Sequence, residues 1–273
     1  MITCAWSKTL PVQNPWAREL CGCFYKRGDH SVCFYAYKNQ VHMLFDNETE
    51  SHAICCMEKG QITQPSSWHI YGGSDSELLL LNETLGIDLR SLIPSANLSA
   101  DASAYYRAKQ KEKRRDGILM NDDDYCIKAR GQSSYVCESN GQRSWTFTGQ
   151  AYLYTPIYRY ADNICFGTAG KGGWVYIISL KTGEVITKIK TGGTVSIVQI
   201  GGLCFFLANL PKATLLCVDL LTGEILQEVS VRGISEYSTL YLLDKKLHTI
   251  TFEYRNRILV NAIWHCFSLD TER

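Results

Sequence analysis

The second half of the chain is built of repeats, and their period constrains the fold more than any other feature. Turn-forming glycines recur at Gly141, Gly183 and Gly223, at spacings of 42 and 40 residues. A second glycine follows each of them and recurs at spacings of 43 and 41 residues. Because two landmarks keep nearly the same period, the segment is predicted to consist of copies of one supersecondary unit.

Each repeat predicts four short strands. In one repeat the strands are expected at 155–160, 163–167, 175–180 and 185–190, and in the next at 195–200, 203–207, 215–220 and 225–231. In the third strand of the first repeat, one face is predicted to carry Val175, Ile177 and Ser179, and the other Tyr176, Ile178 and Leu180. The repeats lack a helical apolar stripe, and four-stranded units of about 40–45 residues are typical of β-propeller blades.

The first half of the chain shows the same pattern in a weaker form. Strands are predicted at 32–37, 41–45 and 52–57 for one unit, and at 68–72 and 77–81 for another. Turns near positions 49, 86, 141, 183, 223 and 271 then indicate six units. The interval of 55 residues between the second and third turns is too long for one plain unit. It contains an alanine-rich segment without Gly or Pro, which predicts a helical insertion at about 99–116.

The two ends of the chain are expected to meet in one sheet. The last residues follow a segment that reads as a third strand, so a fourth strand is missing there. Residues 2–10 can supply it by pairing with the strand near 263–269, and Trp6 resembles Trp145, which lies in a predicted fourth strand. Such pairing would remove an open sheet edge.

Two repeats carry a motif that resembles a known family. Asp219-Leu-Leu-Thr-Gly-Glu224, and Asn140-Gly-Gln-Arg-Ser-Trp145 with Gly149 after it, resemble the quinoprotein repeat of the pyrroloquinoline-quinone-like β-propeller superfamily. The resemblance covers about residues 125–235. It implies an all-β chain that forms a single β-propeller domain over 1–273, with six blades preferred and seven as the alternative. Enzymes and binding scaffolds share this repeat, so it indicates the fold and not the function.

Composition excludes several classes of protein. Lys and Arg number 28 against 27 Asp and Glu, so no chain-wide charge favours nucleic acid or an anionic membrane. The hydrophobic fraction of 45% excludes a disordered chain. No run of 18 apolar residues predicts a membrane-spanning helix. The segment after Met1 lacks the features of a secretory signal, so a cytoplasmic location is expected.

The twelve cysteines are expected to be reduced thiols, most of them buried. Cys21 and Cys23 share one strand face near three histidines; core packing is favoured over a metal site, because the spacing matches no standard zinc motif. Cys55-Cys56 resembles the adjacent pair whose disulfide stacks on the cofactor in quinone dehydrogenases. The resemblance implies that those enzymes are longer, exported, eight-bladed chains with a calcium site, and this chain differs from them. We therefore expect neither quinone nor any other cofactor here.

No motif for a nucleophile, a phosphate-binding loop or a zinc protease is present, and no catalytic residue is predicted. The acidic run Asn121-Asp-Asp-Asp124 is interpreted as a solvated turn rather than a calcium loop. Residues 107–115 of the insertion carry six positive charges and one negative charge. The candidate partner-binding residues are Tyr105, Arg107, Lys111, Lys113, Arg114 and Arg115. The alternative interpretation of this segment is an ordinary solvated helix.

The function class favoured by the sequence is a non-catalytic binding module that recognises a protein partner. A basic insertion fits an acidic partner and, less well, nucleic acid. One concrete version is an inhibitor or immunity-type protein. The alternative is an enzyme of hydrolase or lyase type, with its active site at the propeller channel.

Overall fold

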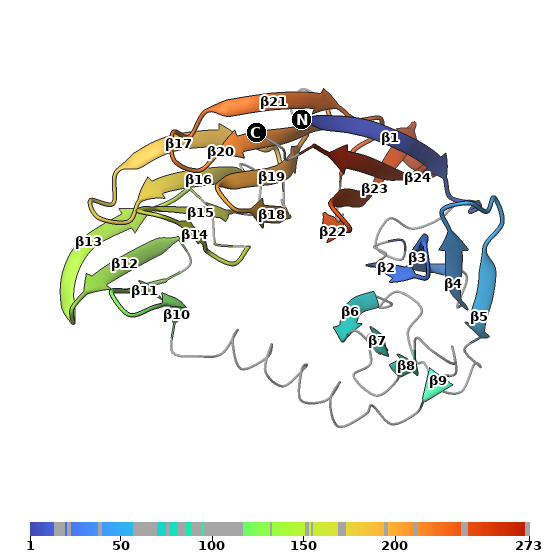
Figure 1. Cartoon of the computed structure of the whole chain (residues 1–273), viewed down its shortest axis with the longest axis horizontal. Coiled ribbons are helices and arrows are strands. Elements are labelled where there is room, and N and C mark those ends of the chain that lie inside the picture. The colour runs from blue at the N-terminus through green and yellow to red at the C-terminus, as the bar shows by residue number, and fades with distance from the viewer. Residues whose placement is uncertain are drawn as a thin grey trace. The chain divides into compact units, whose positions relative to one another are not determined.

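The computed structural model describes residues 1–13, 20, 23–37, 40–56, 70–74, 77–80, 86–88, 94–95, 117–131, 133–150, 153, 155–168, 173–193, 196–209, 212–235 and 240–270. For residues 36, 54–56 and 70–95 this description covers the backbone alone. The described residues form 24 strands in six four-stranded sheets and no helix (Figure 1).

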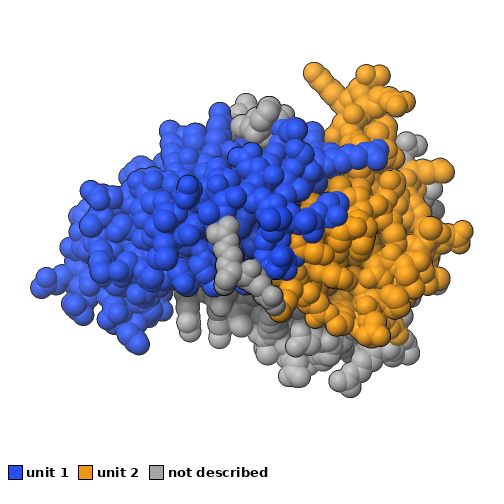
Figure 2. Space-filling model, turned by 45° about the horizontal axis from the view of Figure 1, so that its top comes forward, with its two compact units in different colours: residues 1–4, 114–236, 269–273 blue, residues 5–113, 237–268 orange. Residues whose placement is uncertain are grey.

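The chain divides into two compact units (Figure 2). Unit 1 contains Met1–Cys4, Arg114–Glu236 and Leu269–Arg273, and unit 2 contains Ala5–Lys113 and Tyr237–Ser268. The predicted single domain over 1–273 stays a prediction, as does the number of blades.

Unit 1 holds three sheets. The first consists of β10 (Ile118–Asn121), β11 (Tyr125–Ala129), β12 (Ser134–Ser139) and β13 (Gln142–Thr148). The second consists of β14 (Tyr158–Tyr160), β15 (Asn163–Gly167), β16 (Trp174–Ser179) and β17 (Val185–Lys190). The third consists of β18 (Ile197–Ile200), β19 (Leu203–Ala208), β20 (Thr214–Asp219) and β21 (Ile225–Ser230).

Unit 2 holds the other three sheets, apart from the first residues of β1 and the last of β24. One consists of β2 (Cys23–Arg27), β3 (His30–Tyr37), β4 (Gln40–Phe45) and β5 (His52–Cys56). Another consists of β6 (Ile70–Ser74), β7 (Glu77–Leu80), β8 (Gly86–Asp88) and β9 (Pro94–Ser95). The last has the order β1 (Ile2–Thr9), β24 (Ile258–Leu269), β23 (Lys246–Arg255) and β22 (Tyr241–Leu243).

This strand order confirms the predicted fold class, an all-β chain of four-stranded blades. Five sheets are antiparallel meanders of consecutive strands, which is the order of a propeller blade. Two predicted strands, 163–167 and 185–190, have the observed bounds of β15 and β17. The first strand of the same repeat is shorter than predicted, because β14 begins at Tyr158. The helical insertion predicted at about 99–116 lies outside the described residues.

The predicted alternation in β16 is confirmed, and it explains how the sheets of unit 1 stack. Val175 and Ile177 belong to an apolar cluster with residues of β19 and β20, such as Phe206 and Val218. Tyr176 and Ile178 of the same strand, and Leu180 just after it, belong to a second cluster with residues of β12 and β13. The sheet β14–β17 therefore buries both faces of β16 against its two neighbours, as a strand with two apolar rows requires.

One repeated position joins each sheet of unit 1 to the backbone of another segment: to the end of the next third strand, to the next turn, or to the start of β1. The residue four places after each turn glycine is Trp145, Thr187 or Gln227. The Trp145 Nε1 donates a hydrogen bond to the Leu180 carbonyl at 2.7 Å, and the Thr187 hydroxyl donates to the Gly223 carbonyl at 2.9 Å. Gln227 accepts from the backbone N–H of Ile2 at 2.6 Å and donates to its carbonyl at 2.7 Å.

The close approach of Trp145 explains the glycine at position 183. Gly183 has a φ of 75°, in the left-handed region that favours glycine. A Cβ at this position would lie 2.6 Å from Cγ of Trp145. The repeat therefore couples a turn residue to the indole of the preceding sheet.

The predicted pairing of the two chain ends is confirmed. Strand β1 is the neighbour of β24 in the last sheet. The Leu10 N–H donates to the Ala262 carbonyl at 2.8 Å, and the Asp270 N–H donates to the Met1 carbonyl at 2.8 Å. Because the two bonds join opposite ends of the strands, the pairing is antiparallel.

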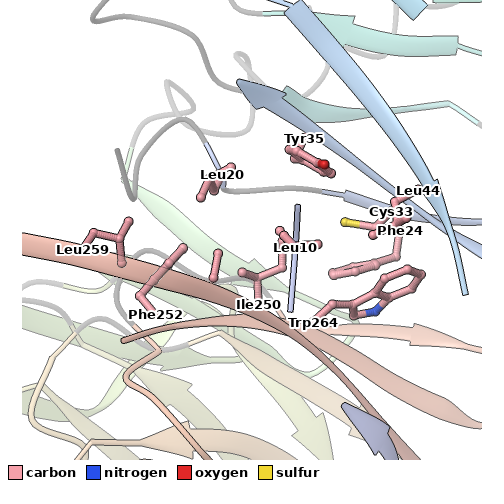
Figure 3. Packing of buried hydrophobic residues seen from close by; sticks show 11 residues of the cluster. Leu10, Leu20, Phe24, Cys33, Tyr35, Leu44, Ile250, Phe252, Leu259 and Trp264 are labelled. Atoms are coloured by element: carbon pink, nitrogen blue, oxygen red, sulfur yellow. The ribbon is translucent and has the colours of Figure 1, made fainter. Parts of the chain in front are cut away.

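The apolar core of unit 2 lies between its last sheet and the sheet β2–β5 (Figure 3). Its buried members are Leu10, Leu20, Phe24, Cys33, Tyr35, Leu44, Ile250, Phe252, Leu259, Ala262 and Trp264. The cysteine prediction fits this packing. Seven of the nine described free cysteines are buried, in both units, whereas Cys21, Cys55 and Cys56 have no described side chain.

Candidate functional site

The predicted partner-binding residues cannot be placed. Tyr105, Arg107, Lys111, Lys113, Arg114 and Arg115 all lie outside the described residues. Their role in recognition stays a prediction, and the candidate surfaces below come from the described part of the chain.

The acidic run predicted to be a solvated turn is held by hydrogen bonds. One Asp122 carboxylate oxygen accepts from the backbone N–H of Asp124 at 3.1 Å and of Tyr125 at 2.8 Å, and the other pairs with Arg159. Partial burial raises the pKa of the Asp122 carboxyl, but these hydrogen bonds outweigh it and the net direction is downward. Its hydrogen-bond partners show that this carboxylate stabilises the turn before β11.

His248 is buried in the aromatic core of unit 2. Its ring lies 5.5 Å from Phe24 and 5.9 Å from Trp264, measured between ring centroids. The Trp264 Nε1 donates to His248 Nδ1 at 3.1 Å, so Nδ1 is the unprotonated nitrogen. Burial, and secondarily the charge of Lys246, lower the pKa of His248 to about 4. The imidazole is therefore neutral near pH 7 and serves packing.

A serine–histidine contact in the last sheet resembles half of a nucleophilic triad. The Ser7 Oγ lies 2.7 Å from His265 Nδ1, and the Thr251 Oγ1 lies 2.8 Å from His265 Nε2. A catalytic base needs a group that stabilises the imidazolium, usually a carboxylate, whereas the group at Nε2 is a hydroxyl. The three residues come from β1, β24 and β23, so the network joins three adjacent strands.

Lys8 also joins separate segments of unit 2, because it ties β1 to the turn after β4. Its ammonium donates to the carbonyls of Phe45 at 3.0 Å, Asp46 at 2.5 Å and Glu48 at 2.5 Å, in the turn after β4. Burial lowers the pKa of Lys8, although Asp46 and Glu48 act in the opposite direction. Within the described residues, no group of three or more His, Cys, Asp or Glu side chains is arranged to hold a metal ion.

Exposed aliphatic side chains gather along two neighbouring turns of unit 1. We call Val185, Ile186, Leu221 and Ile225 the rim patch; they are 44%, 38%, 52% and 39% exposed. They lie at the start of the edge strands β17 and β21 and in the turn before β21. A Cβ on Gly223 would lie 3.0 Å from Ile186 Cγ2, so this turn rests directly against Ile186. Ile186 therefore lies next to the turn that carries Leu221, whereas Val185 pairs with Ile178 at the start of the same edge strand.

A second exposed group lies at the end of the longest hairpin. Strands β23 and β24 have 10 and 12 residues and are joined by Asn256-Arg257. We call residues 253–260 the hairpin tip. Ile258 is 61% exposed and Val260 36% exposed, and Arg255 and Arg257 lie beside them on the surface. In the described part of the chain, neither guanidinium has a carboxylate within ion-pair distance.

Sequence reasoning missed both surfaces, for different reasons. The rim patch could have been found by aligning the repeats, because Leu221 stands where the preceding repeat has Lys181. The hairpin tip had no comparable signal, since Asn256-Arg257 lacks the glycine that marks a two-residue hairpin turn.

Comparisons with known proteins give no family. No protein-family model matches the chain, and no curated protein matches it. The crystal structure of BamB from Moraxella catarrhalis is 14% identical, with coverage of 92% of this chain and 70% of that chain and a TM-score of 0.38. The WD40 β-propeller domain of Doa1 is 10% identical, with coverage of 99% and 98% and a TM-score of 0.34. At these values the fold class rests on the strand order described above.

Within the described ranges, no helical segment has the length and hydropathy that crossing a bilayer would require.

Proposed function

We propose that this chain is a non-catalytic binding module that recognises a protein partner. The observation that carries the proposal is the rim patch of Val185, Ile186, Leu221 and Ile225. Exposed aliphatic side chains gathered at neighbouring turns are a feature of protein interaction surfaces, because covering them removes apolar area from water.

The position of the rim patch supports recognition over a folding role. The inward side chains of β17 and β21 are half-buried, and Ile189 packs against the core cluster of β19 and β20. Lysines on the same strand, Lys188 and Lys190, are exposed, as expected on a solvated sheet edge. None of the four aliphatic residues belongs to the core clusters of unit 1, and a partner surface accounts for their exposure.

Finer features of the proposal come from the sequence. The basic insertion would contribute a contact for an acidic partner, and an inhibitor or immunity-type role is one form that such binding could take. The repeat motifs of the sequence suggest that the chain is a quinoprotein-repeat propeller that does not bind the quinone. We propose that it acts in the cytoplasm.

The test begins with a photo-crosslinking amino acid at position 221 in the protein's native host, followed by identification and purification of the cross-linked protein. The double variant Val185→Asp/Leu221→Asp is then expected to raise the Kd for that protein by about tenfold or more, because charge would be buried in an apolar interface. The matched control is Ile118→Asp, which changes an exposed aliphatic residue of unit 1 outside the patch. An unchanged Kd for the double variant would refute the role of the rim patch.

A further inference from the structure

The hairpin tip extends past the strands that flank it. Strand β22 pairs with β23 only from Lys246 to His248. On the other side, the hydrogen bond between Leu10 and Ala262 is followed by a turn at Val12 that leaves the sheet. Beyond these points, β23 and β24 pair only with each other among the described strands.

The base of this hairpin is firmly anchored. Phe252 and Leu259 are buried, and they belong to the unit 2 core together with Leu10 and Leu20 (Figure 3). The side chain of Asn261 donates a hydrogen bond to Glu253 at 2.8 Å across the two strands. The tip is thus held by a buried base, and its own side chains are not needed to fill the core.

The turn at the tip has a residue where glycine would be favoured. Asn256 and Arg257 have φ values of 51° and 65°, so both central residues of the turn are left-handed. The equivalent turn between β12 and β13 has Asn140-Gly141, the pair that this geometry favours. The arginine at position 257 therefore adopts a strained backbone conformation, as Lys245 does with a φ of 58° in the other hairpin of this sheet.

We infer that the hairpin tip docks an acidic, partly apolar segment of a protein partner. Arg255 and Arg257 would bind carboxylates of that segment, since guanidinium groups form paired hydrogen bonds with carboxylates. Ile258 and Val260 would cover its apolar side chains. This inference rests on the proposed function and adds a second contact, of stated charge, in unit 2.

The tip favours a protein over a membrane or nucleic acid. Electrostatic binding to anionic lipids usually takes about four to eight clustered basic residues, whereas the tip has two. Phosphate backbones are bound by basic and polar groups, which would leave the exposed Ile258 and Val260 without a partner.

The experiment uses the intact protein and a phage library of random 16-residue peptides. Selection on the wild type is followed by counter-selection on Arg255→Glu/Arg257→Glu, and Kd values of the recovered peptides are measured. The matched control is Lys212→Glu/Lys245→Glu, which reverses two exposed lysines and changes the net charge equally. Arg257→Gly is included because it removes the side chain and leaves a turn that glycine favours.

We expect the recovered peptides to be rich in Asp and Glu with apolar neighbours. Their Kd should rise by about tenfold or more with either arginine variant and by less than about twofold with the lysine control. Peptides without acidic enrichment, or equal losses in both charge-reversed variants, would overturn the inference.

Two further arms separate the alternatives. Vesicles of phosphatidylcholine and phosphatidylserine, and a single-stranded oligonucleotide, are tested with the same variants. Binding of either that depends on the arginines, without acidic peptides, would assign the tip to a different ligand class and overturn the inference. If the cross-linked protein binds through the rim patch and ignores the tip, the proposed function stands and the inference about the tip fails.

Discussion

The three sheets of unit 1 and the last sheet of unit 2 share the four-stranded plan but use their strands differently. In unit 1 no strand exceeds seven residues, and β15 is buried along its whole length. In unit 2, β23 and β24 reach 10 and 12 residues and expose the end of their hairpin. The strands of unit 1 run past their neighbours by no more than two residues, whereas β23 continues well past β22.

This difference shows where each region places its stabilising contacts. In unit 1 the same sequence position joins each sheet to the backbone of another segment, through Trp145, Thr187 and Gln227. In unit 2, strand β1 is held by hydrogen bonds that do not recur along the chain. Lys8 donates to carbonyls of the turn after β4, and Ser7 bonds to His265. Regular contacts leave a repeat in the sequence, and irregular ones do not.

The largest effect that should separate the regions is the removal of the indole in unit 1. Trp145→Ala is expected to lower the free energy of unfolding by about 3–5 kcal/mol, because it empties a packed site above Gly183 and removes a buried hydrogen bond. Thr187→Ala, at the same repeat position, should cost about 1 kcal/mol, since it removes one hydrogen bond. Urea unfolding measures both. Equal losses in the two variants would show that the indole does not act through packing.

Most of the strand pattern of unit 1 could be predicted from the sequence because its causes are local and repeated. A glycine with positive φ is needed in each tight turn, and two apolar rows are needed where both faces are covered. Strands β2, β22 and β23 were not predicted individually, since their turns lack the repeat's Thr-Gly-Glu sequence. The Asp244-Lys245 and Asn256-Arg257 turns both adopt positive φ without glycine.

The candidate surfaces were harder to predict than the fold. Exposure of Val185 or Ile258 depends on which strand is the sheet edge and on where its neighbours end. The edge position of β17 follows from a meander of consecutive strands, whereas the point at which the long hairpin is left unpaired depends on β1, far away in the chain, and local periodicity encodes neither. The basic segment that the sequence did single out, 107–115, lies outside the described residues and stays a prediction.

A smaller effect, confined to unit 2, should appear on acidification. The pKa of His248 is lowered to about 4 by burial, whereas an exposed histidine titrates near 6.5. Between these values the unfolded chain binds a proton that the folded chain does not, so stability is present above pH 6.5 and is lost as the pH falls toward 4. From pH 7.0 to 4.5 this histidine should account for about 2–3 kcal/mol of lost unfolding free energy.

The matched variant for this effect is His248→Gln, which can still accept the hydrogen bond from Trp264 but does not titrate. Its unfolding free energy should depend less on pH than that of the wild type by the same amount. Parallel pH profiles for the two proteins would mean that the imidazole is not desolvated as its burial indicates.

The smallest expected effect compares two hairpin turns directly. The turn Asn256-Arg257 of unit 2 has arginine where the turn Asn140-Gly141 of unit 1 has the favoured glycine. Arg257→Gly should raise the free energy of unfolding by up to about 1 kcal/mol, since glycine adopts a φ of 65° without the strain of a side chain. The reverse change in the regular turn, Gly141→Arg, should lower it by a similar amount, because that glycine has a φ of 74° and nothing within 4 Å of its Cβ position. Thermal unfolding of both variants checks the pair. A stabilised Arg257→Gly protein that loses peptide binding would show that the hairpin keeps its arginine for recognition at the expense of stability. A destabilised one would mean that the arginine side chain supports the fold, and the contrast between the regular turn and the hairpin tip would have to be explained by packing.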